Sequence, residues 1–202
     1  LVFQYPEYQL FEETVYKDIA FGPKNIGMTE EETHKAVLDS AKLMKVRDNM
    51  LEKSPFDLSG GQKRRVAIAG VMAMEPEIII FDEPTAGLDP SGRETIFKAI
   101  RDYRKKKNAT VIIVSHSMED IAAICDKVLV MNGGEVALFG ETREVFSKKD
   151  LLKEKGLNVP LVTNVMHELK RKYPQLNADV LTVEEAVNSL LEFVNKEGNG
   201  DA

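Results

Sequence analysis

The sequence predicts an α/β fold that is preceded by a helical segment and followed by a helical extension. Two observations favour this class. The apolar segments 78–82 and 110–115 have the length of strands, and a helical pattern at 91–107 separates them. Strands that alternate with helices in this way form parallel sheets covered by helices. After Gly140 the pattern changes to amphipathic helices alone, which predicts a separate C-terminal extension.

Composition limits the function classes. The chain has 202 residues, of which 43% are hydrophobic and 30% charged, as is typical of a globular protein with its own core. The net charge of −6 argues against nucleic acid as the main partner, because phosphate backbones attract clustered Lys and Arg. The single cysteine, Cys125, cannot form an internal disulfide and is expected to pack in the core.

Helix-start signals are clear in the first 75 residues. Thr29 and Glu32 form a capping box at the start of one expected helix. A second helix should begin at Ser59, beside a glycine pair, and run to about Met74, because Pro76 ends it.

The middle of the chain alternates between strand and helix patterns, which predicts a βαβ sheet. The turn sequence Asn132-Gly133-Gly134 is typical of a β-hairpin. The elements expected here cover 78–82, 91–107, 110–115, 118–125, 127–131 and 135–139.

Two amphipathic helices are expected in the C-terminal extension. Leu161, Val165 and Leu169 lie on one face of the first. Thr182 and Glu185 should form a capping box for the second. The apolar positions of that second helix are Val183, Ala186, Val187, Leu190, Leu191 and Val194.

The segment Ser59-Gly60-Gly61-Gln62 is the first candidate for chemistry. Glycines beside a helix N-terminus let a phosphate approach backbone N–H groups that carry partial positive charge. Taken alone, the segment fits an ordinary helix cap better than a phosphate site, because Ser is common at helix starts.

A pair of carboxylates follows the apolar strand 78–82. Asp82 and Glu83 come at its C-terminal end, where ligands bind in open α/β sheets. Asp82 is placed to hold Mg²⁺ directly or through water, and Glu83 to orient or deprotonate an attacking water. Asp89 follows in a tight loop, and His116 comes at the end of the next strand, where it could contact a phosphate.

In this order the motifs resemble those of ABC ATPases: signature Ser59 to Gln62, Walker B carboxylates Asp82 and Glu83, D-loop Asp89 and switch histidine His116. Gln4 matches the family's Q-loop glutamine. The resemblance implies an ABC-type P-loop NTPase that binds ATP and Mg²⁺. It implies catalytic roles for Gln4, Glu83 and His116, metal binding by Gln4 and Asp82, and nucleotide contacts from Ser59, Gly60, Gly61, Gln62 and Asp89. It also implies a dimer in which the signature of one subunit closes over ATP held by the other.

A finer resemblance is to the ATPase subunits of energy-coupling-factor importers of vitamins and metal ions. It rests on the segments 3–11 and 18–23 and on the helical tail. It implies a second ATPase subunit, a transmembrane coupling subunit, a substrate-binding membrane subunit and a place at the cytoplasmic face of the membrane. Tyr5, Tyr8, Phe11 and Phe21 could line a groove that receives coupling helices, although Phe21 fits internal packing as well.

No Gly-x-x-x-x-Gly-Lys-Ser/Thr motif occurs in the sequence. In the resembling family this P-loop precedes the Q-loop, and its backbone nest and lysine hold the β- and γ-phosphates. We therefore expect that the chain is truncated before the Q-loop and alone does not bind ATP in the usual way. The sheet should then have an exposed edge that invites pairing with another chain.

The expected domains are a Q-loop and helical subdomain at 1–75, a core α/β subdomain at 76–147 and a helical extension at 148–202. Two other functions stay open at this point: an ABC-type ATPase of DNA maintenance, and a non-catalytic dimerisation module. The sequence does not identify the transported substrate or which of two paired ATPase subunits this is.

Overall fold

The computed structural model describes residues 1–198. The chain divides into two compact units, Leu1–Val114 and Ser115–Ala202, and each is described by itself. This division falls inside the expected core segment 76–147, so the expected domain boundaries remain predictions.

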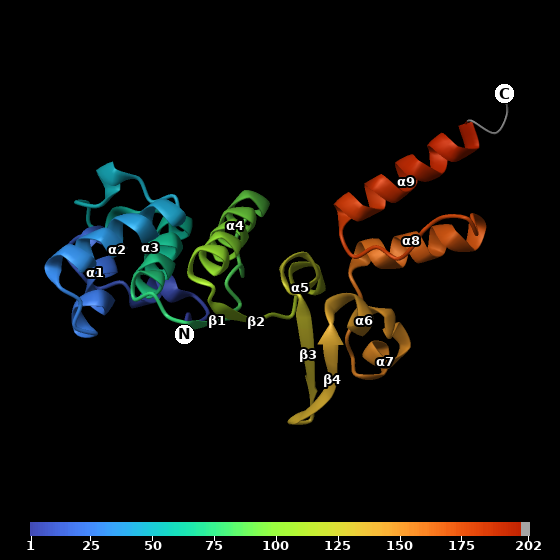
Figure 1. The fold of residues 1–202 in the computed structure, drawn as a ribbon, viewed down its shortest axis with the longest axis horizontal. Helices are drawn as coiled ribbons and strands as arrows, with labels where there is room; N and C mark the ends of the chain where they lie inside the picture. Colours follow the sequence, from blue (N-terminus) through green and yellow to red (C-terminus); the bar gives the residue numbers. More distant parts are fainter. Residues whose placement is uncertain (199–202) are drawn as a thin grey trace. The chain divides into compact units, whose positions relative to one another are not determined.

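The first unit opens with helices that pack on one another (Figure 1). Their common core contains Ile19, Val37, Met44 and Ile68, each with 0% of its surface exposed. The helical elements are η1 (Pro6–Gln9), α1 (Val15–Asn25), α2 (Glu30–Leu43), η2 (Asp48–Met50), η3 (Pro55–Asp57) and α3 (Gly60–Ala73).

The caps of α2 and α3 confirm the expected helix starts. The Thr29 hydroxyl accepts from Glu32 N at 3.2 Å, and the Glu32 carboxylate accepts from Thr29 N at 2.8 Å. Ser59 and Gln62 form the same reciprocal pair at the start of α3, with distances of 3.4 and 2.9 Å. These bonds satisfy backbone donors that the first turn of a helix leaves unpaired.

The helix α1 was not expected from the sequence, because it contains Pro23 and Gly22. The Thr14 hydroxyl caps it by accepting from Lys17 N at 3.2 Å. A Cβ at Gly22 would lie 2.7 Å from the Met74 side chain, which follows α3. Tertiary packing of α1 on α3 therefore outweighs the weak helix propensity of this segment.

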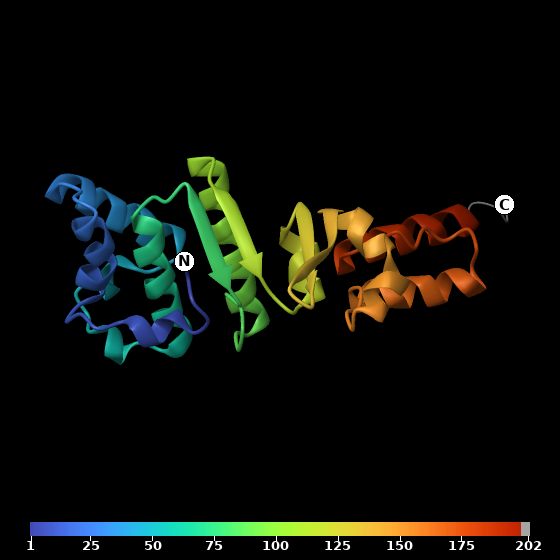
Figure 2. The ribbon, with the colours of Figure 1, turned by 90° about the horizontal axis from the view of Figure 1, so that it is seen from below.

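The strands β1 (Ile78–Asp82) and β2 (Thr110–Val114) are parallel and are joined by the helix α4 (Pro90–Lys107), as expected. Figure 2 shows α4 running along one face of this pair. Ile79 and Phe81 of β1 are completely buried. On the opposite face Ile78 and Val114 are 61% and 52% exposed. The covered face therefore supplies the core of this layer.

Val2 pairs with β1 on the side opposite β2. It forms a parallel bridge to Phe81, in which Val2 N donates to the Ile80 carbonyl at 2.8 Å and Asp82 N donates to the Val2 carbonyl at 2.9 Å. Among the described residues, β1 is the only strand that pairs with β2.

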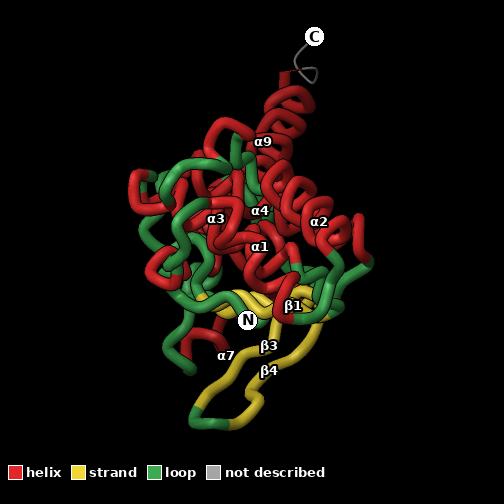
Figure 3. The backbone as a smooth tube through the Cα atoms, turned by 90° about the vertical axis from the view of Figure 1, so that its left-hand side faces the viewer, coloured by secondary structure: helices red, strands yellow, loops and turns green. Residues whose placement is uncertain are grey.

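The second unit contains a separate antiparallel sheet, which corrects the expectation of one βαβ sheet through the middle of the chain. Its strands are β3 (Lys127–Asn132) and β4 (Glu135–Glu141), and the helix α5 (Met118–Ile124) precedes them. Gly133 and Gly134 have φ angles of 59° and 83°, the conformation that the predicted tight hairpin turn requires. Figure 3 shows this hairpin in yellow.

Helices complete the second unit: α6 (Thr142–Ser147), α7 (Lys149–Glu154), α8 (Leu161–Lys172) and α9 (Val183–Gly198). The sequence predicted α8 and α9, whereas α6 and α7 are too short to show a clear period. One buried cluster joins the hairpin to α6 and α7 through Val128, Phe146 and Leu152. A second joins α8 to α9 through Met166 and Ala186.

The apolar stripes expected on α8 and α9 are mostly exposed. Leu161 and Val165 of α8 are 70% and 50% exposed, and the fully buried contact is Met166 instead. The predicted box at Thr182 and Glu185 is present in part. Glu185 N donates to the Thr182 hydroxyl at 3.2 Å, but the Glu185 carboxylate accepts from Leu181 N and pairs with Arg143.

Candidate functional site

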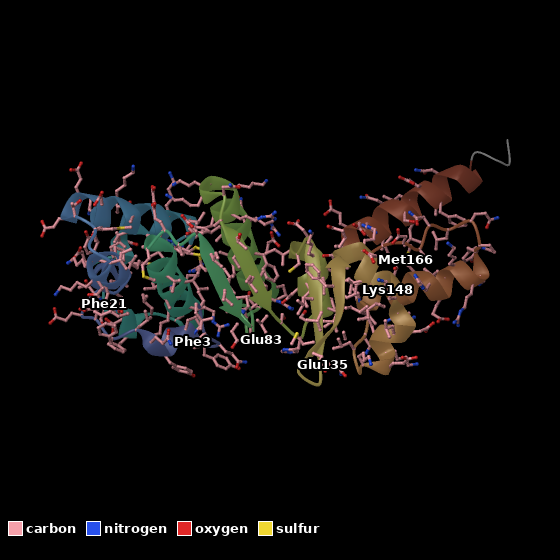
Figure 4. All side chains as sticks on the ribbon, turned by 60° about the horizontal axis from the view of Figure 1, so that its bottom comes forward. Phe3, Phe21, Glu83, Glu135, Lys148 and Met166 are labelled. Carbon is pink, nitrogen blue, oxygen red and sulfur yellow. The ribbon has the colours of Figure 1, made fainter. Side chains whose placement is uncertain are left out.

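The expected Walker B carboxylates lie at the C-terminal end of β1, and both are half-buried. Glu83 follows directly after the strand (Figure 4). Its φ angle is 47°, in the left-handed region, and its N–H donates to the Val114 carbonyl at 2.9 Å. A non-glycine residue in this conformation is strained, and such strain clusters at functional sites.

Gln4 follows the parallel bridge between Val2 and Phe81 by two residues and is exposed. The bridge brings the first residues of the chain beside β1. Approach of Gln4 to the carboxylates remains a prediction. An amide oxygen and the Asp82 carboxylate are hard oxygen donors, which fit Mg²⁺. Among residues 1–198 no group of three or more His, Cys, Asp or Glu could hold a metal ion by itself.

The signature segment presents open glycines at the start of α3. A Cβ at Gly60 would meet no atom within 4 Å, and one at Gly61 would only reach the Leu88 side chain at 4.0 Å. Neither residue has a positive φ. The fold of this chain therefore does not itself require glycine at either position.

The D-loop aspartate has a structural role in this chain. Asp89 is the N-cap of α4, and its carboxylate accepts from Gly92 N at 3.1 Å. Its neighbour Leu88 lies beside Gly61, so the D-loop and the signature helix meet in the first unit. Contact between Asp89 and a nucleotide remains a prediction.

His116 is exposed and belongs to the second unit. Its approach to Glu83 and to a phosphate also remains a prediction.

Sequence analysis missed Arg64, which joins three parts of the first unit. Its side chain is 3% exposed and makes a bidentate ion pair with Glu7 of η1, Nε to Oε2 at 2.9 Å and Nη2 to Oε1 at 2.7 Å. Its Nη1 donates to the Ala86 carbonyl, after the Walker B carboxylates. The Tyr5 ring lies 5.5 Å from the guanidinium.

A signal for this contact was present in the sequence. Arg64 lies one turn before Ile68 and two turns before Met72, so it occupies the buried stripe of α3. A charged residue on a buried stripe needs a partner, because burial of an unpaired charge is costly.

Exposed aromatic side chains surround the Q-loop segment. Tyr8 is 85% exposed, and Phe11 packs edge-on against Phe21 at 4.8 Å while more than half of its surface stays exposed. Tyr5 and Tyr8 form a second ring pair, with centroids 6.2 Å apart. A role of these rings in an interface remains a prediction. In the described part of the chain, no helix combines the length and the apolarity that a membrane span requires.

Comparisons with known proteins identify the family of the chain. The ABC transporter family model matches residues 1–86. The energy-coupling factor transporter ATP-binding proteins EcfA2 of Caldanaerobacter subterraneus subsp. tengcongensis and Clostridium perfringens are 52% and 54% identical to this chain. Each alignment covers 96% of this chain and 68% of the relative.

A solved structure is also similar. The cbiO1 protein of Clostridium perfringens, part of the ABC transporter complex cbiONQ, is 40% identical with a TM-score of 0.67. The match covers 84% of this chain and 66% of the solved chain, which is just under two thirds of its length. On these matches, the chain belongs to the energy-coupling factor transporter ATP-binding proteins of the ABC transporter family.

Proposed function

We propose that this chain is the catalytic part of an ATP-hydrolysing subunit that drives the import of a vitamin or a metal ion across a membrane. The observation that carries the proposal is the position of Asp82 and Glu83 at the C-terminal end of β1, with Glu83 in a left-handed backbone conformation. Relatives at about half identity that are named as transporter ATP-binding proteins support the same activity.

The residues at this edge have distinct roles in the proposed reaction. Glu83 orients an attacking water or removes its proton, and Asp82 with Gln4 holds the Mg²⁺ that accompanies ATP. When bound, this ion neutralises charge on the transferred phosphate. Glu83 has a left-handed backbone conformation, which is strained for a non-glycine residue. Such strain is consistent with a pre-organised site.

The open signature glycines support a second ATPase subunit as a partner. A Cβ at Gly60 would meet nothing within this chain, so there is room at this position for a partner to approach. In our proposal, Ser59, Gly60, Gly61 and Gln62 close over ATP that the partner subunit holds, with Asp89 nearby.

The exposed aromatic residues support a membrane partner. We assign Tyr5, Tyr8, Phe11 and Phe21 to a surface that receives a transmembrane coupling subunit, which acts together with a substrate-binding membrane subunit. The chain would then lie at the cytoplasmic face of the membrane as a peripheral subunit. The solved relative is itself part of a transporter complex, which favours this assignment over DNA maintenance.

Two experiments test the proposal. Calorimetry with Mg²⁺ and ATP compares this chain with a version preceded by the P-loop segment of a relative, since no P-loop motif occurs in the printed sequence. We expect tight binding only by the extended version, and tight binding by the chain alone would refute our account of the phosphate site.

Co-purification tests the membrane role, because an ATPase that never associates with a transmembrane subunit does not drive import.

A further inference from the structure

A cavity of about 420 Å³ lies within the second unit, away from every residue proposed above for ATP chemistry. Its walls come from α6, from α8 and from the segment that connects α8 to α9. Small-molecule sites have volumes of about 300–1,000 Å³, so the cavity is large enough for a small ligand.

The floor of the cavity is apolar. Phe146, Ala178 and Leu181 line it, and each is at least nine-tenths buried. Phe146 and Leu181 belong to the cluster around the hairpin, whereas Ala178 belongs to the cluster between α8 and α9. Figure 4 marks Met166, another member of that second cluster, on α8. The cavity therefore lies at the seam between two hydrophobic clusters, where an apolar group would contact both.

Arginine and lysine predominate among the charged lining residues. Arg143, Lys170 and Arg171 line the rim beside His167, and Asp179 is the carboxylate among the lining residues. This balance contrasts with the net charge of −6 of the whole chain. A cavity with an apolar floor and a cationic rim selects an anion that carries an apolar body.

The rim cations differ in how far they are already neutralised. Arg143 is held by Asp179 at 3.2 Å and by Glu185 at 2.8 Å, so it fixes the wall rather than offering a free charge. Arg171 pairs with Glu168 at 3.0 Å, but both side chains are mostly exposed, and such pairs are weak. Lys170 makes no ion pair with any residue of the described range 1–198. Lys170 and Arg171 are thus the charges available to a ligand.

Helix polarity alone does not account for this cluster. Lys170, Arg171 and Lys172 lie in the last turn of α8, where cations complement the helix dipole. However, Arg143 comes from α6 and still lines the cavity. Lys172 is equally close to the helix end, yet it faces the Tyr173 ring and does not line the cavity.

We propose that this cavity is a binding site for a small organic anion, a phosphate monoester or a carboxylate with an apolar body of about one ring. The apolar body would pack on Phe146, Ala178 and Leu181, and the anionic group would accept hydrogen bonds from Lys170 and Arg171. The site is independent of the proposed ATP hydrolysis and does not rest on it.

Phenyl phosphate is the test ligand, titrated into the full chain by calorimetry and by NMR at roughly 0.15 M salt. We expect saturable binding that the double variant Lys170→Gln/Arg171→Gln weakens about tenfold or more, the loss expected for charge-assisted hydrogen bonds. Lys172→Gln is the matched control and should leave binding unchanged. Inorganic phosphate lacks the apolar ring and benzyl alcohol lacks the anionic group, so each should bind more weakly than phenyl phosphate. Benzoate in place of phenyl phosphate distinguishes a carboxylate site from a phosphate site.

Further variants and probes make the test decisive. Ala178→Leu should fill the cavity and abolish binding, and a thermal melt shows whether this variant is folded. If Ala178→Leu does not fold, the comparison of Lys170→Gln/Arg171→Gln with Lys172→Gln tests the proposal. Three results would each overturn the proposal. The first is that neither anion binds, and the second is that Lys172→Gln weakens binding as much as Lys170→Gln/Arg171→Gln does. The third is that a folded Ala178→Leu variant binds as tightly as the unchanged chain. Binding only to vesicles that contain phosphatidic acid would overturn it in favour of a membrane contact.

Discussion

Arg64 and Glu7 are 57 residues apart in the sequence and form a bidentate ion pair in the interior of the first unit, with N–O distances of 2.9 and 2.7 Å. Because Arg64 also donates to the Ala86 carbonyl, one side chain connects the Q-loop segment, the signature helix and the turn after the Walker B carboxylates. A polar contact therefore joins these three segments, in addition to the parallel bridge between Val2 and Phe81.

Removal of one partner of this pair should be costly. Arg64→Met leaves the Glu7 carboxylate, which is 14% exposed, without its counter-charge, and about 3 kcal/mol of unfolding free energy should be lost. The double variant Glu7→Leu/Arg64→Met should recover most of that loss, because an apolar pair of similar volume replaces the ions. Urea unfolding measures all three chains. Arg101→Met is the control, since its pair with Glu94 is exposed and should contribute less than about 1 kcal/mol.

The backbone at Glu83 gives a second prediction. Glycine adopts a left-handed φ without strain, so Glu83→Gly should be more stable than Glu83→Ala by about 1 kcal/mol. The order should reverse at Glu94 inside α4, where glycine is the poorer helix former. Equal stability of the two Glu83 variants would show that this residue is not strained. Thermal or urea unfolding of the four variants gives the comparison.

At Gly60 stability and activity should separate. Gly60→Ala meets no steric obstacle within the chain and should leave stability unchanged or raise it by up to about 0.5 kcal/mol. The added methyl group would nevertheless obstruct the approach of ATP held by a partner, so turnover of the assembled ATPase should fall. Gly92→Ala is the contrasting control, because its Cβ would lie 2.8 Å from the Asp89 carboxylate and should destabilise α4. An undiminished turnover for Gly60→Ala would contradict the assigned role of the signature.

Cys125 provides a pH-dependent prediction. Burial, and secondarily the charge of Asp126, raise the pKa of the Cys125 thiol to about 11. Alkylation by iodoacetamide at pH 8 should therefore be at least about 100-fold slower in the folded chain than in the unfolded chain, because the thiolate is the reactive form. Since the unfolded thiol ionises first, the free energy of unfolding should fall as pH rises from about 9 towards 11. Equal alkylation rates in the two states would contradict the raised pKa.

Local signals in the sequence predicted local structure well. The caps at Thr29 and Ser59 and the strand Ile78–Asp82 follow from side chains within a few positions of each element. The sequence pattern also located the carboxylates Asp82 and Glu83, because a strand end positions whatever residues follow it.

Tertiary contacts were harder to predict from the sequence. The ion pair of Arg64 depends on a residue 57 positions away. The left-handed φ of Glu83 could not be predicted, because glycine and asparagine are the residues that usually indicate this conformation. The alternation of strands and helices also did not reveal that β3 and β4 leave the first sheet, since both sheets use the same short apolar runs. Helical periodicity likewise marked the apolar faces of α8 and α9 without indicating which part of each face is covered.

The central claim is that the carboxylate after β1 activates the water that attacks ATP. Single-turnover ATP hydrolysis by the complete subunit, assembled with its ATPase partner, tests this most directly when wild type is compared with Glu83→Gln. We expect the variant to bind ATP as tightly as wild type and to hydrolyse it about 10²–10⁴-fold more slowly, the usual contribution of general base catalysis. A Glu83→Gln variant that hydrolyses ATP at the wild-type rate would remove Glu83 from this role.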